Sequence, residues 1–333
     1  MAGKIMMVNV LLTRRCNLRC EYCDIVRDYE GRPVEYPKVE TIKDRTAEEW
    51  IADFEVLREL YKDKKDLFFI LYGGEPFLFH GLTKIIMYLG EHDLNYTIIT
   101  NGTLVGIVEQ VKDLGIRGLS CSVDPLTFEE NKDRDKKAWN GFNLLSVVKK
   151  EIPNCDCTAE IVVDNDNVTG LIPLVKKLSD KGVWSSITIA ERKKNKYYDF
   201  ASNSEKSKAD SVTVREKFEM IFNMAESKMV KVHVPKILKW LSSIMPMESR
   251  DCGLLENSMT IEPDGCLRLC LRIRGVETPR FKVKALGEKL FSVCAAQEED
   301  FTNYCEGCAW TCPQMPQLSK EHEEITHKEV KVV

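Results

Sequence analysis

The sequence predicts an α/β fold in which a parallel sheet curves toward a barrel and a cysteine-rich module follows. Two observations support this prediction. Apolar, β-branched runs alternate with amphipathic helical patterns through the first 190 residues of the 333-residue chain. Ten of the thirteen cysteines fall into two groups, one near the start and one in the last quarter. Alternation of this kind is typical of parallel sheets, because each helix returns the chain to the edge where the next strand begins.

Six runs are predicted to be buried strands, with five helices between them. The strands are expected at 8–13, 67–72, 96–100, 118–123, 158–163 and 185–190. The helices are expected at 46–63, 77–92, 104–115, 140–152 and 168–182. Gly115 and Gly182 each stand just before a strand, where a glycine that ends a helix is expected. Cys121, Cys155 and Cys157 lie in apolar or strand-like segments and are predicted to be small buried hydrophobic residues.

The composition favours a globular protein in a reducing compartment. A net charge of −4 and a pI of about 5.9 leave no overall basic field, so we expect no nucleic-acid partner. No apolar run reaches the ~18 residues that a membrane span requires, and the N-terminus lacks a signal-peptide cleavage site. We therefore expect a cytoplasmic protein without a membrane partner. Thirteen cysteines, an odd number, then favour metal binding or chemistry over disulfides.

The patterning changes after residue 190. The polar segment 191–211 is predicted to be a long loop or linker with a solvated charge run. Helical segments are predicted around 212–228 and 235–244. We divide the chain into a barrel core over 1–190, a linker with helices that face a substrate over 191–249, a cysteine-rich module over 250–318 and a tail over 319–333.

Three cysteines, Cys16, Cys20 and Cys23, directly follow the first predicted strand. Ligand sites in parallel α/β folds lie at this edge of the sheet. Structural zinc sites use four ligands, whereas a [4Fe–4S] cluster held by three thiolates leaves one iron for another ligand. The spacing C-x3-C-x2-C, with Tyr22 before the third cysteine, resembles the signature of the radical S-adenosylmethionine (SAM) enzymes. A zinc knuckle is the alternative.

Motifs at the ends of the next three strands support this resemblance. The segment YGGEP, residues 72–76, resembles the GGEP motif of the family, which receives the methionine amino group of SAM. The segment TNGT, residues 100–103, ends the third strand as the family pattern does. The segment SCSVDP, residues 120–125, resembles the S-x-D motif that lies beside the SAM ribose or carboxylate. The agreement of four motifs at four successive strand ends favours the radical SAM family.

The resemblance implies a partial (β/α)6 barrel that binds SAM and a [4Fe–4S] cluster, with Cys16, Cys20 and Cys23 as catalytic metal ligands. It implies that Glu75 offers its carboxylate to an ammonium group, and that glycines before it let the backbone approach the methionine. Arg134 or Lys136 is the candidate for the SAM carboxylate, and solvated surface is the alternative for most of the run KDRDKK that contains them. The implied cofactor-binding residues are Tyr22, Gly73, Gly74, Glu75, Pro76, Thr100, Asn101, Ser122 and Asp124.

The second cysteine group resembles the twitch form of the SPASM auxiliary-cluster modules. Cys252, Gly265 and Cys270 match its C-x12-G-x4-C opening, with a hairpin turn predicted at EPDG, residues 262–265. A full SPASM module has more cysteines than the segment CEGCAWTC provides, so one auxiliary [4Fe–4S] cluster is implied. The implied ligands are Cys252, Cys270, Cys305 and Cys308, with Cys312 as an alternative to either of the last two. Cys266 and Cys294 are predicted bystanders, and a zinc ribbon is the alternative for the whole group.

The resemblance predicts an enzyme that cleaves SAM reductively and abstracts hydrogen from a substrate. In the first hypothesis the substrate is a small polar metabolite (a sugar, aminocyclitol or nucleotide), oxidised with the help of the auxiliary cluster. In the second, the protein is a maturase that crosslinks, oxidises or epimerises a peptide side chain. The cluster motif begins at Cys16, which leaves no room for a preceding leader-binding domain and favours the first hypothesis. A non-catalytic iron–sulfur electron carrier is the third, but it would not need a SAM pocket. An electron donor such as flavodoxin or ferredoxin is the expected protein partner.

Overall fold

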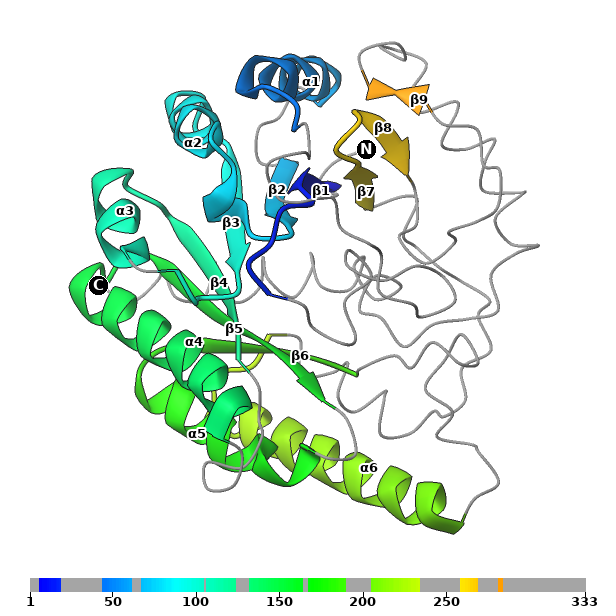
Figure 1. Cartoon of the computed structure of the whole chain (residues 1–333). Helices are drawn as coiled ribbons and strands as arrows, with labels where there is room; N and C mark the ends of the chain where they lie inside the picture. The colour runs from blue at the N-terminus through cyan, green and yellow to red at the C-terminus, as the bar shows by residue number, and fades with distance from the viewer. Residues whose placement is uncertain are drawn as a thin grey trace.

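The structure is a computed structural model of the chain. It describes residues 6–18, 44–61, 67–104, 106–123, 132–163, 167–189, 205–233, 258–268 and 281–283. Strands and helices alternate through the first part of the chain as the sequence predicts (Figure 1). The first six strands are β1 Met6–Thr13, β2 Leu67–Gly73, β3 Asn95–Thr100, β4 Gly118–Ser122, β5 Asp156–Val163 and β6 Trp184–Ile189. The helices are α1 Ala47–Leu60, α2 Leu82–Glu91, α3 Ile107–Asp113, α4 Lys132–Glu151, α5 Leu171–Asp180 and α6 Glu205–Glu226, with short 3₁₀ turns η3 Pro76–Leu78 and η4 Val168–Gly170.

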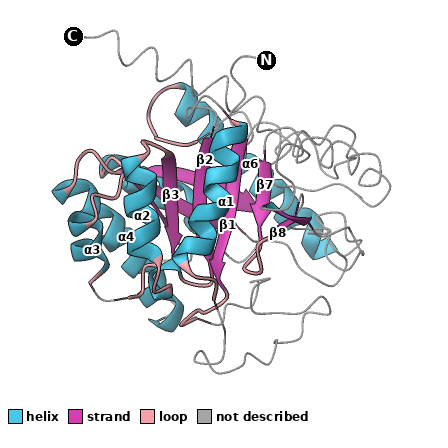
Figure 2. Ribbon diagram, turned by 90° about the horizontal axis from the view of Figure 1, so that it is seen from above, coloured by secondary structure: helices cyan, strands magenta, loops and turns pink. Residues whose placement is uncertain are grey.

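One sheet connects all nine strands of the described residues, in the order β6-β5-β4-β3-β2-β1-β7-β8-β9. The strands from β1 to β6 pair in parallel, each with the next in sequence. The sheet curves, and α1 to α5 cover its convex face (Figures 1 and 2). This is the mostly parallel α/β architecture that the sequence predicts.

The last three strands extend the sheet beyond β1. They are β7 Ser258–Ile261, β8 Cys266–Arg268 and β9 Phe281–Lys282. Strand β7 pairs with β1 in parallel, whereas β8 returns antiparallel to β7. The predicted hairpin around EPDG is therefore present, and its first strand is also a strand of the barrel sheet.

The core lies between the convex face of the sheet and its helices. Trp50 and Phe54 of α1 are fully buried, and the ring of Phe54 lies 4.8 Å from that of Phe69 of β2. Cys121 is buried among these apolar groups, as the sequence predicts, and desolvation raises the pKa of its thiol. Cys155 and Cys157 are likewise buried. None of these three thiols is exposed enough to act as a ligand or nucleophile at the surface.

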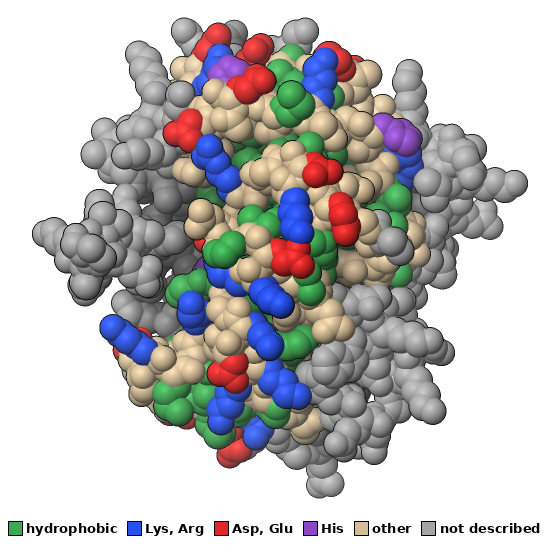
Figure 3. Space-filling model, turned by 90° about the vertical axis from the view of Figure 1, so that its left-hand side faces the viewer, with side chains coloured by type: hydrophobic (Ala, Val, Ile, Leu, Met, Phe, Trp, Pro, Cys, Tyr) green, Lys and Arg blue, Asp and Glu red, His purple; other side chains and the backbone are tan. Residues whose placement is uncertain are grey.

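Local sequence signals set the ends of several helices. Thr46 caps α1, because its hydroxyl accepts from the Glu49 amide while the Glu49 carboxylate accepts from the Thr46 amide. Gly115 and Gly182 follow α3 and α5 with φ angles of 58° and 75°, as glycines that end helices do. The outer surface over the helices carries interspersed basic and acidic side chains (Figure 3). None of the described helices combines the length and apolarity needed to cross a bilayer.

Two helix boundaries differ from the sequence prediction. Helix α6 begins at Glu205, so the part of the predicted loop from 205 to 211 is helical and that prediction was wrong there. Helix α4 begins at Lys132, before the predicted start at residue 140. Both added segments are rich in Lys, Glu, Ala or Asp, and Lys, Glu and Ala have good intrinsic helix propensity. Charge density alone does not distinguish a polar loop from a solvated helix. The helix predicted around 235–244 lies outside the described residues.

Candidate active site

The carboxyl ends of β1, β2 and β3 bring the first three motifs together. The structure describes Cys16, Gly73, Gly74, Glu75, Pro76, Thr100, Asn101 and Ser122 among the predicted site residues. The remaining predicted ligands and cofactor contacts, Cys20, Tyr22, Cys23, Asp124, Cys252, Cys270, Cys305, Cys308 and Cys312, lie outside the described residues, as do the side chains of Arg134 and Lys136.

The two glycines of the GGEP turn face the chain that leads to Cys16. The Gly74 amide donates to the Thr13 carbonyl and the Glu75 amide to the Arg15 carbonyl, both at 2.7 Å. A Cβ atom on Gly73 would lie 2.4 Å from the Thr13 oxygen, and one on Gly74 would lie 2.1 Å from the Arg15 oxygen. Glycine is therefore required at both positions because the protein backbone occupies the space that a side chain would take. The sequence prediction gave a different reason, the close approach of the SAM methionine.

Glu75 is fully buried, and its carboxylate accepts hydrogen bonds from the end of β3 and from the turn that follows β2. Its Oε1 atom accepts from Thr100 Oγ1 at 2.8 Å and from the Phe77 amide at 3.2 Å. Its Oε2 atom accepts from the Asn101 amide at 2.8 Å. Burial raises the pKa of this carboxyl, and the same donors lower it in part. Glu75 thus links the turn after β2 to the loop after β3.

Cys16 lies three residues beyond the end of β1 and has an 8% exposed side chain. Its Sγ atom accepts from the Leu18 amide at 3.3 Å and from Asn101 Nδ2 at 3.7 Å. N–H donors directed at a cysteine sulfur are the environment that a thiolate ligand of an iron–sulfur cluster requires. The residues present therefore fit one ligand position of such a cluster.

A second network, which the sequence did not reveal, fixes the turn before Cys16. The Asp44 carboxylate accepts from Thr13 Oγ1 at 2.7 Å and from Arg15 Nε at 2.8 Å. The Arg15 amide donates to Thr13 Oγ1 at 3.0 Å. Asp44 is the aspartate of the pair Asp44–Arg45 that precedes α1, and no motif marks it in the sequence. It orients the chain as it leaves β1.

Ser122 and Glu160 lie on the inner face of the sheet, the face turned away from α1 to α5. Ser122 is exposed at the end of β4 and pairs in register with Glu160 of β5, which in turn pairs with Ser186 of β6. The hydroxyls of Ser186 and Ser120 interact with the half-buried Glu160 carboxylate. Burial raises its pKa, and these hydroxyls lower it in part. Glu160 makes no ion pair with any described residue.

Polar groups line the same face on the other strands. Thr97 Oγ1 and Ser120 Oγ lie 3.3 Å apart, and Asn9 Nδ2 donates to Ser258 Oγ at 2.8 Å. Because residues two apart in a strand share a face, these side chains and Glu160 line one polar concave wall. Neither Glu160 nor Asn9 was among the site residues predicted from the sequence. The signal in the sequence that could have identified them is that each polar side chain interrupts an otherwise apolar run.

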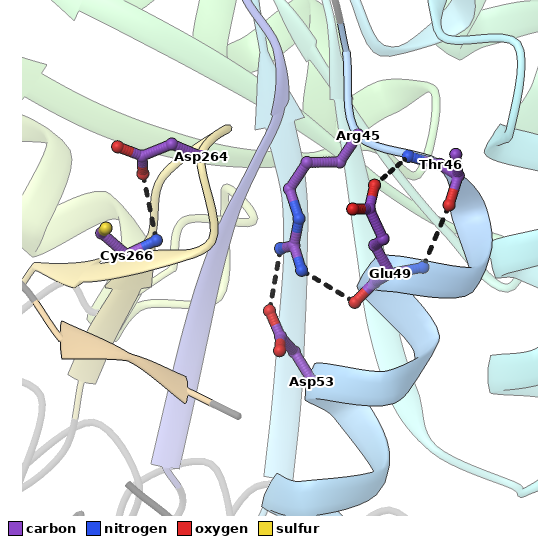
Figure 4. Close-up of polar contacts among 6 residues, drawn as sticks. All are labelled: Arg45, Thr46, Glu49, Asp53, Asp264 and Cys266. Carbon is purple, nitrogen blue, oxygen red and sulfur yellow. Dashed lines mark hydrogen bonds and ion pairs between the residues drawn. The ribbon is translucent and has the colours of Figure 1, made fainter. Parts of the chain in front are cut away.

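The hairpin of the cysteine-rich segment packs beside the Cys16 turn. Arg14 pairs with the buried Glu262 at 3.3 Å. Arg45 donates to Asp53 and to the Glu49 carbonyl, both at 2.8 Å (Figure 4). The hairpin turn stands against this guanidinium, since a Cβ on its glycine, Gly265, would lie 2.9 Å from the Arg45 Cζ atom. The same turn is closed by the Cys266 amide, which donates to Asp264 at 3.0 Å (Figure 4).

Comparison with known proteins agrees with this geometry. Residues 10–168 match the family model described as the Radical SAM superfamily. This part of the chain is a radical SAM domain. It contains Cys16, the GGEP turn, the TNGT loop, Ser122 and Glu160, whereas Asn9, Ser186 and Ser258 of the inner wall lie outside the matched residues.

Curated relatives align with part of this chain over part of their own length. A probable GTP 3′,8-cyclase of Pyrococcus abyssi is 28% identical over 151 residues, which cover 44% of this chain and 42% of that protein. A GTP 3′,8-cyclase of Nautilia profundicola is 30% identical over 189 residues, 54% of each chain. The chain thus spans about half the length of these relatives.

Solved structures align with most of the chain. Streptococcus suis SuiB bound to S-adenosylmethionine aligns with a TM-score of 0.61 at 12% identity, covering 87% of this chain and 64% of SuiB. SuiB bound to its precursor peptide SuiA aligns with the same score at 14% identity, covering 87% and 65%. At this identity the likeness establishes the fold alone.

Proposed function

We propose that the protein is a radical SAM enzyme. When bound, the [4Fe–4S] cluster supplies the electron that cleaves SAM to methionine and a 5′-deoxyadenosyl radical, which abstracts hydrogen from the substrate. The observation that carries the proposal is the buried Cys16 sulfur, which accepts two N–H donors at the strand edge where the GGEP turn and the TNGT loop meet.

The chain's own residues would divide the work of holding the cofactors. Cys16, Cys20 and Cys23 would hold the cluster, and the fourth iron would be left for the amino and carboxylate groups of SAM. Tyr22, the GGEP turn, Ser122 and Asp124 would contact SAM. Glu75 would position the loop after β3 instead of contacting SAM through its carboxylate. All hydrogen bonds that this carboxylate accepts from described residues come from Thr100, Phe77 and Asn101. Burial of the Cys16 sulfur would keep water and oxygen from the cluster.

We propose that the substrate is a small polar metabolite. The inner wall supports this, because Ser120, Ser122 and Ser186 offer hydroxyls and Glu160 offers a carboxylate without a cationic partner among the described residues. Such a wall fits a molecule with several hydroxyl, amino or amide donors, such as a sugar, an aminocyclitol or a nucleotide. The relatives named GTP 3′,8-cyclase, whose name specifies a nucleotide, favour the same class.

A peptide maturase is the second candidate function. It is favoured by the likeness of the fold to SuiB, which was solved with its precursor peptide SuiA. The two candidate functions predict that different substrates are consumed. Incubation of the reduced enzyme and SAM with a size-fractionated cell extract should consume a compound from the small-metabolite fraction if our proposal holds. Consumption of a genome-neighbouring precursor peptide alone would favour the maturase.

We propose that the cysteine-rich module holds one auxiliary [4Fe–4S] cluster that accepts an electron from the substrate radical. Cys252, Cys270, Cys305 and Cys308 would be its ligands, with Cys312 as the alternative to one of the last two. The hairpin supports this placement. Strand β7 begins, and β8 ends, toward the amino-terminal edge of β1, the edge opposite Cys16. The first residue of β7 and the last residue of β8 therefore lie toward the edge of the sheet opposite the proposed SAM site.

We also propose an electron donor such as flavodoxin or ferredoxin and a cytoplasmic location, where thiols stay reduced.

The deciding experiment measures 5′-deoxyadenosine. Anaerobically reconstituted protein, reduced with dithionite in the presence of SAM, should release 5′-deoxyadenosine, and a variant with Cys16, Cys20 and Cys23 all replaced by Ala should not. An equal yield from the triple variant would refute the radical SAM proposal. A reduced cluster without 5′-deoxyadenosine in the wild-type protein would instead indicate an electron carrier.

A further inference from the structure

A closed ring of hydrogen bonds stands beside Cys16 and joins its loop to the loop after β3. Asn101 Nδ2 donates to Asn17 Oδ1 at 2.8 Å, and Asn17 Nδ2 donates to Thr103 Oγ1 at 2.8 Å. Thr103 Oγ1 donates to Asn101 Oδ1 at 2.6 Å and closes the ring. The Thr103 amide donates to the same Asn101 Oδ1 at 3.0 Å.

The ring and the Thr103 backbone amide together permit only one direction for the donors. A hydroxyl has a single proton, and Thr103 uses it on Asn101 Oδ1, so its oxygen must accept from the Asn17 amide group. The Asn17 carbonyl oxygen is then left to accept from Asn101. The Thr103 backbone amide can only donate, and it independently fixes the oxygen of the Asn101 side chain on its own side. The NH₂ group of Asn101 therefore has to face Asn17 and Cys16.

One of the two amide protons of Asn101 is used on Asn17, and the other is directed at the Cys16 sulfur, 3.7 Å from Nδ2. The backbone of Asn101 is held as well, because its amide donates to the buried Glu75 carboxylate. Asn101 is thus fixed at both ends, and its orientation costs little to maintain when a ligand binds at Cys16.

We infer that Asn101 is a positioning residue that sets the reduction potential of the SAM-binding cluster by donating a hydrogen bond to the Cys16 thiolate. The inference rests on the proposed function, since it needs the cluster at Cys16. One-electron reduction adds negative charge to the cluster and its sulfur ligands, with dithionite as the electron source in vitro. An N–H directed at a ligand sulfur stabilises the more negative state and so raises the potential.

The Leu18 amide also donates to Cys16 Sγ, at 3.3 Å, but a backbone donor cannot be removed by a side-chain change. Asn101 is the side-chain donor that the described residues place on this sulfur. Its removal should make the cluster harder to reduce. We expect the equilibrium constant for reduction to fall about threefold to tenfold, which corresponds to about 30–60 mV at 59 mV per tenfold for one electron.

The test is a redox titration followed by electron paramagnetic resonance on the reconstituted full chain. The signal that changes shape on addition of SAM identifies the SAM-binding cluster. The variants Asn101→Ala and Asn101→Asp should both lower its potential. Asn101→Asp keeps the shape of the side chain and both hydrogen bonds from Thr103, but it removes the Nδ2 donor. This variant becomes the test if the Asn101→Ala protein binds less iron than the wild-type protein. Thr103→Val breaks the ring but keeps the Nδ2 donor, so it should shift the potential by less than half as much.

Asn95→Ala is the matched control, because Asn95 is exposed at the opposite end of β3. It should leave the potential unchanged. An Asn101→Ala or Asn101→Asp protein with wild-type iron content and wild-type potential would overturn this inference alone. Absence of a SAM-responsive signal in the wild-type protein would overturn the proposed function and this inference with it.

Discussion

Replacing Glu75 with Gln tests how the GGEP turn works. The carboxylate accepts three donors, and Gln can accept on only one of its two terminal atoms. If the NH₂ group takes the Oε2 position, it faces the Asn101 amide, donor against donor. If it takes the Oε1 position, it faces Thr100 Oγ1 and the Phe77 amide instead. Either arrangement leaves at least one buried donor without an acceptor.

The expected loss of stability follows from these contacts. A buried donor left unsatisfied costs about 1–3 kcal/mol, and removal of the buried charge offsets part of that. We expect a net loss of about 1–2 kcal/mol, or about 2–4 °C in Tm for a chain of this size. The measurement is thermal unfolding of the reconstituted protein by circular dichroism.

Glu48→Gln is the control. Glu48 is an exposed carboxylate that pairs with Lys84, and the same chemical change there should leave Tm unchanged. The affinity for SAM, measured in parallel, should weaken less than the tenfold or more expected if the carboxylate bound the methionine ammonium directly. A Glu75→Gln protein with native Tm and SAM affinity weakened more than tenfold would refute the internal role that the geometry assigns to Glu75.

The remaining predictions concern the clusters, the turn and the inner wall. Cys16→Ala should remove about four iron atoms per chain and abolish 5′-deoxyadenosine release; retention of both would exclude Cys16 as a ligand. Gly74→Ala should lower Tm and cluster content together, because its Cβ would meet the Arg15 carbonyl at 2.1 Å; a native Tm would show that the turn yields easily. The double variant Cys252→Ala/Cys270→Ala should fall from about eight to about four irons, still cleave SAM and form little oxidised product. A folded double variant with native product yield would exclude the electron-acceptor role. For Glu160 the folded-state pKa is raised, so the native protein binds more protons than the unfolded chain above the unfolded pKa of about 4.5. Wild-type Tm should therefore fall relative to that of Glu160→Gln as pH rises from about 4.5 through the folded pKa, and a constant difference between the two proteins would contradict the shift.

The elements of the barrel could be predicted from the sequence because their signals are local. The runs at β2 and β5 are apolar and β-branched, and the patterns of α2 and α5 repeat with the helical period. Gly115 and Gly182 end helices because each adopts a positive φ angle that other residues avoid. The start of α6 was missed, since a run of charged residues has no apolar period to reveal a helix.

The approximate site also followed from the sequence. Motifs at the ends of parallel strands must meet at one edge, so the positions of Cys16, GGEP and TNGT in the sequence predict a common site. The motif types then indicated the radical SAM family, which the domain match at residues 10–168 confirms.

Only the tertiary structure decided which atoms face one another. It turned the Glu75 carboxylate toward Asn101, filled the space beside Gly73 and Gly74 with the backbone before Cys16, and closed the ring through Asn17 and Thr103. It also paired β7 with β1, so that a strand of the cysteine-rich segment belongs to the barrel sheet. The sequence by itself determined the periodic elements and the chemical types of the site residues, since these depend on neighbours along the chain. Hydrogen-bond partners and strand neighbours depend on distances between residues far apart in the chain, and those distances exist only after the sheet has formed.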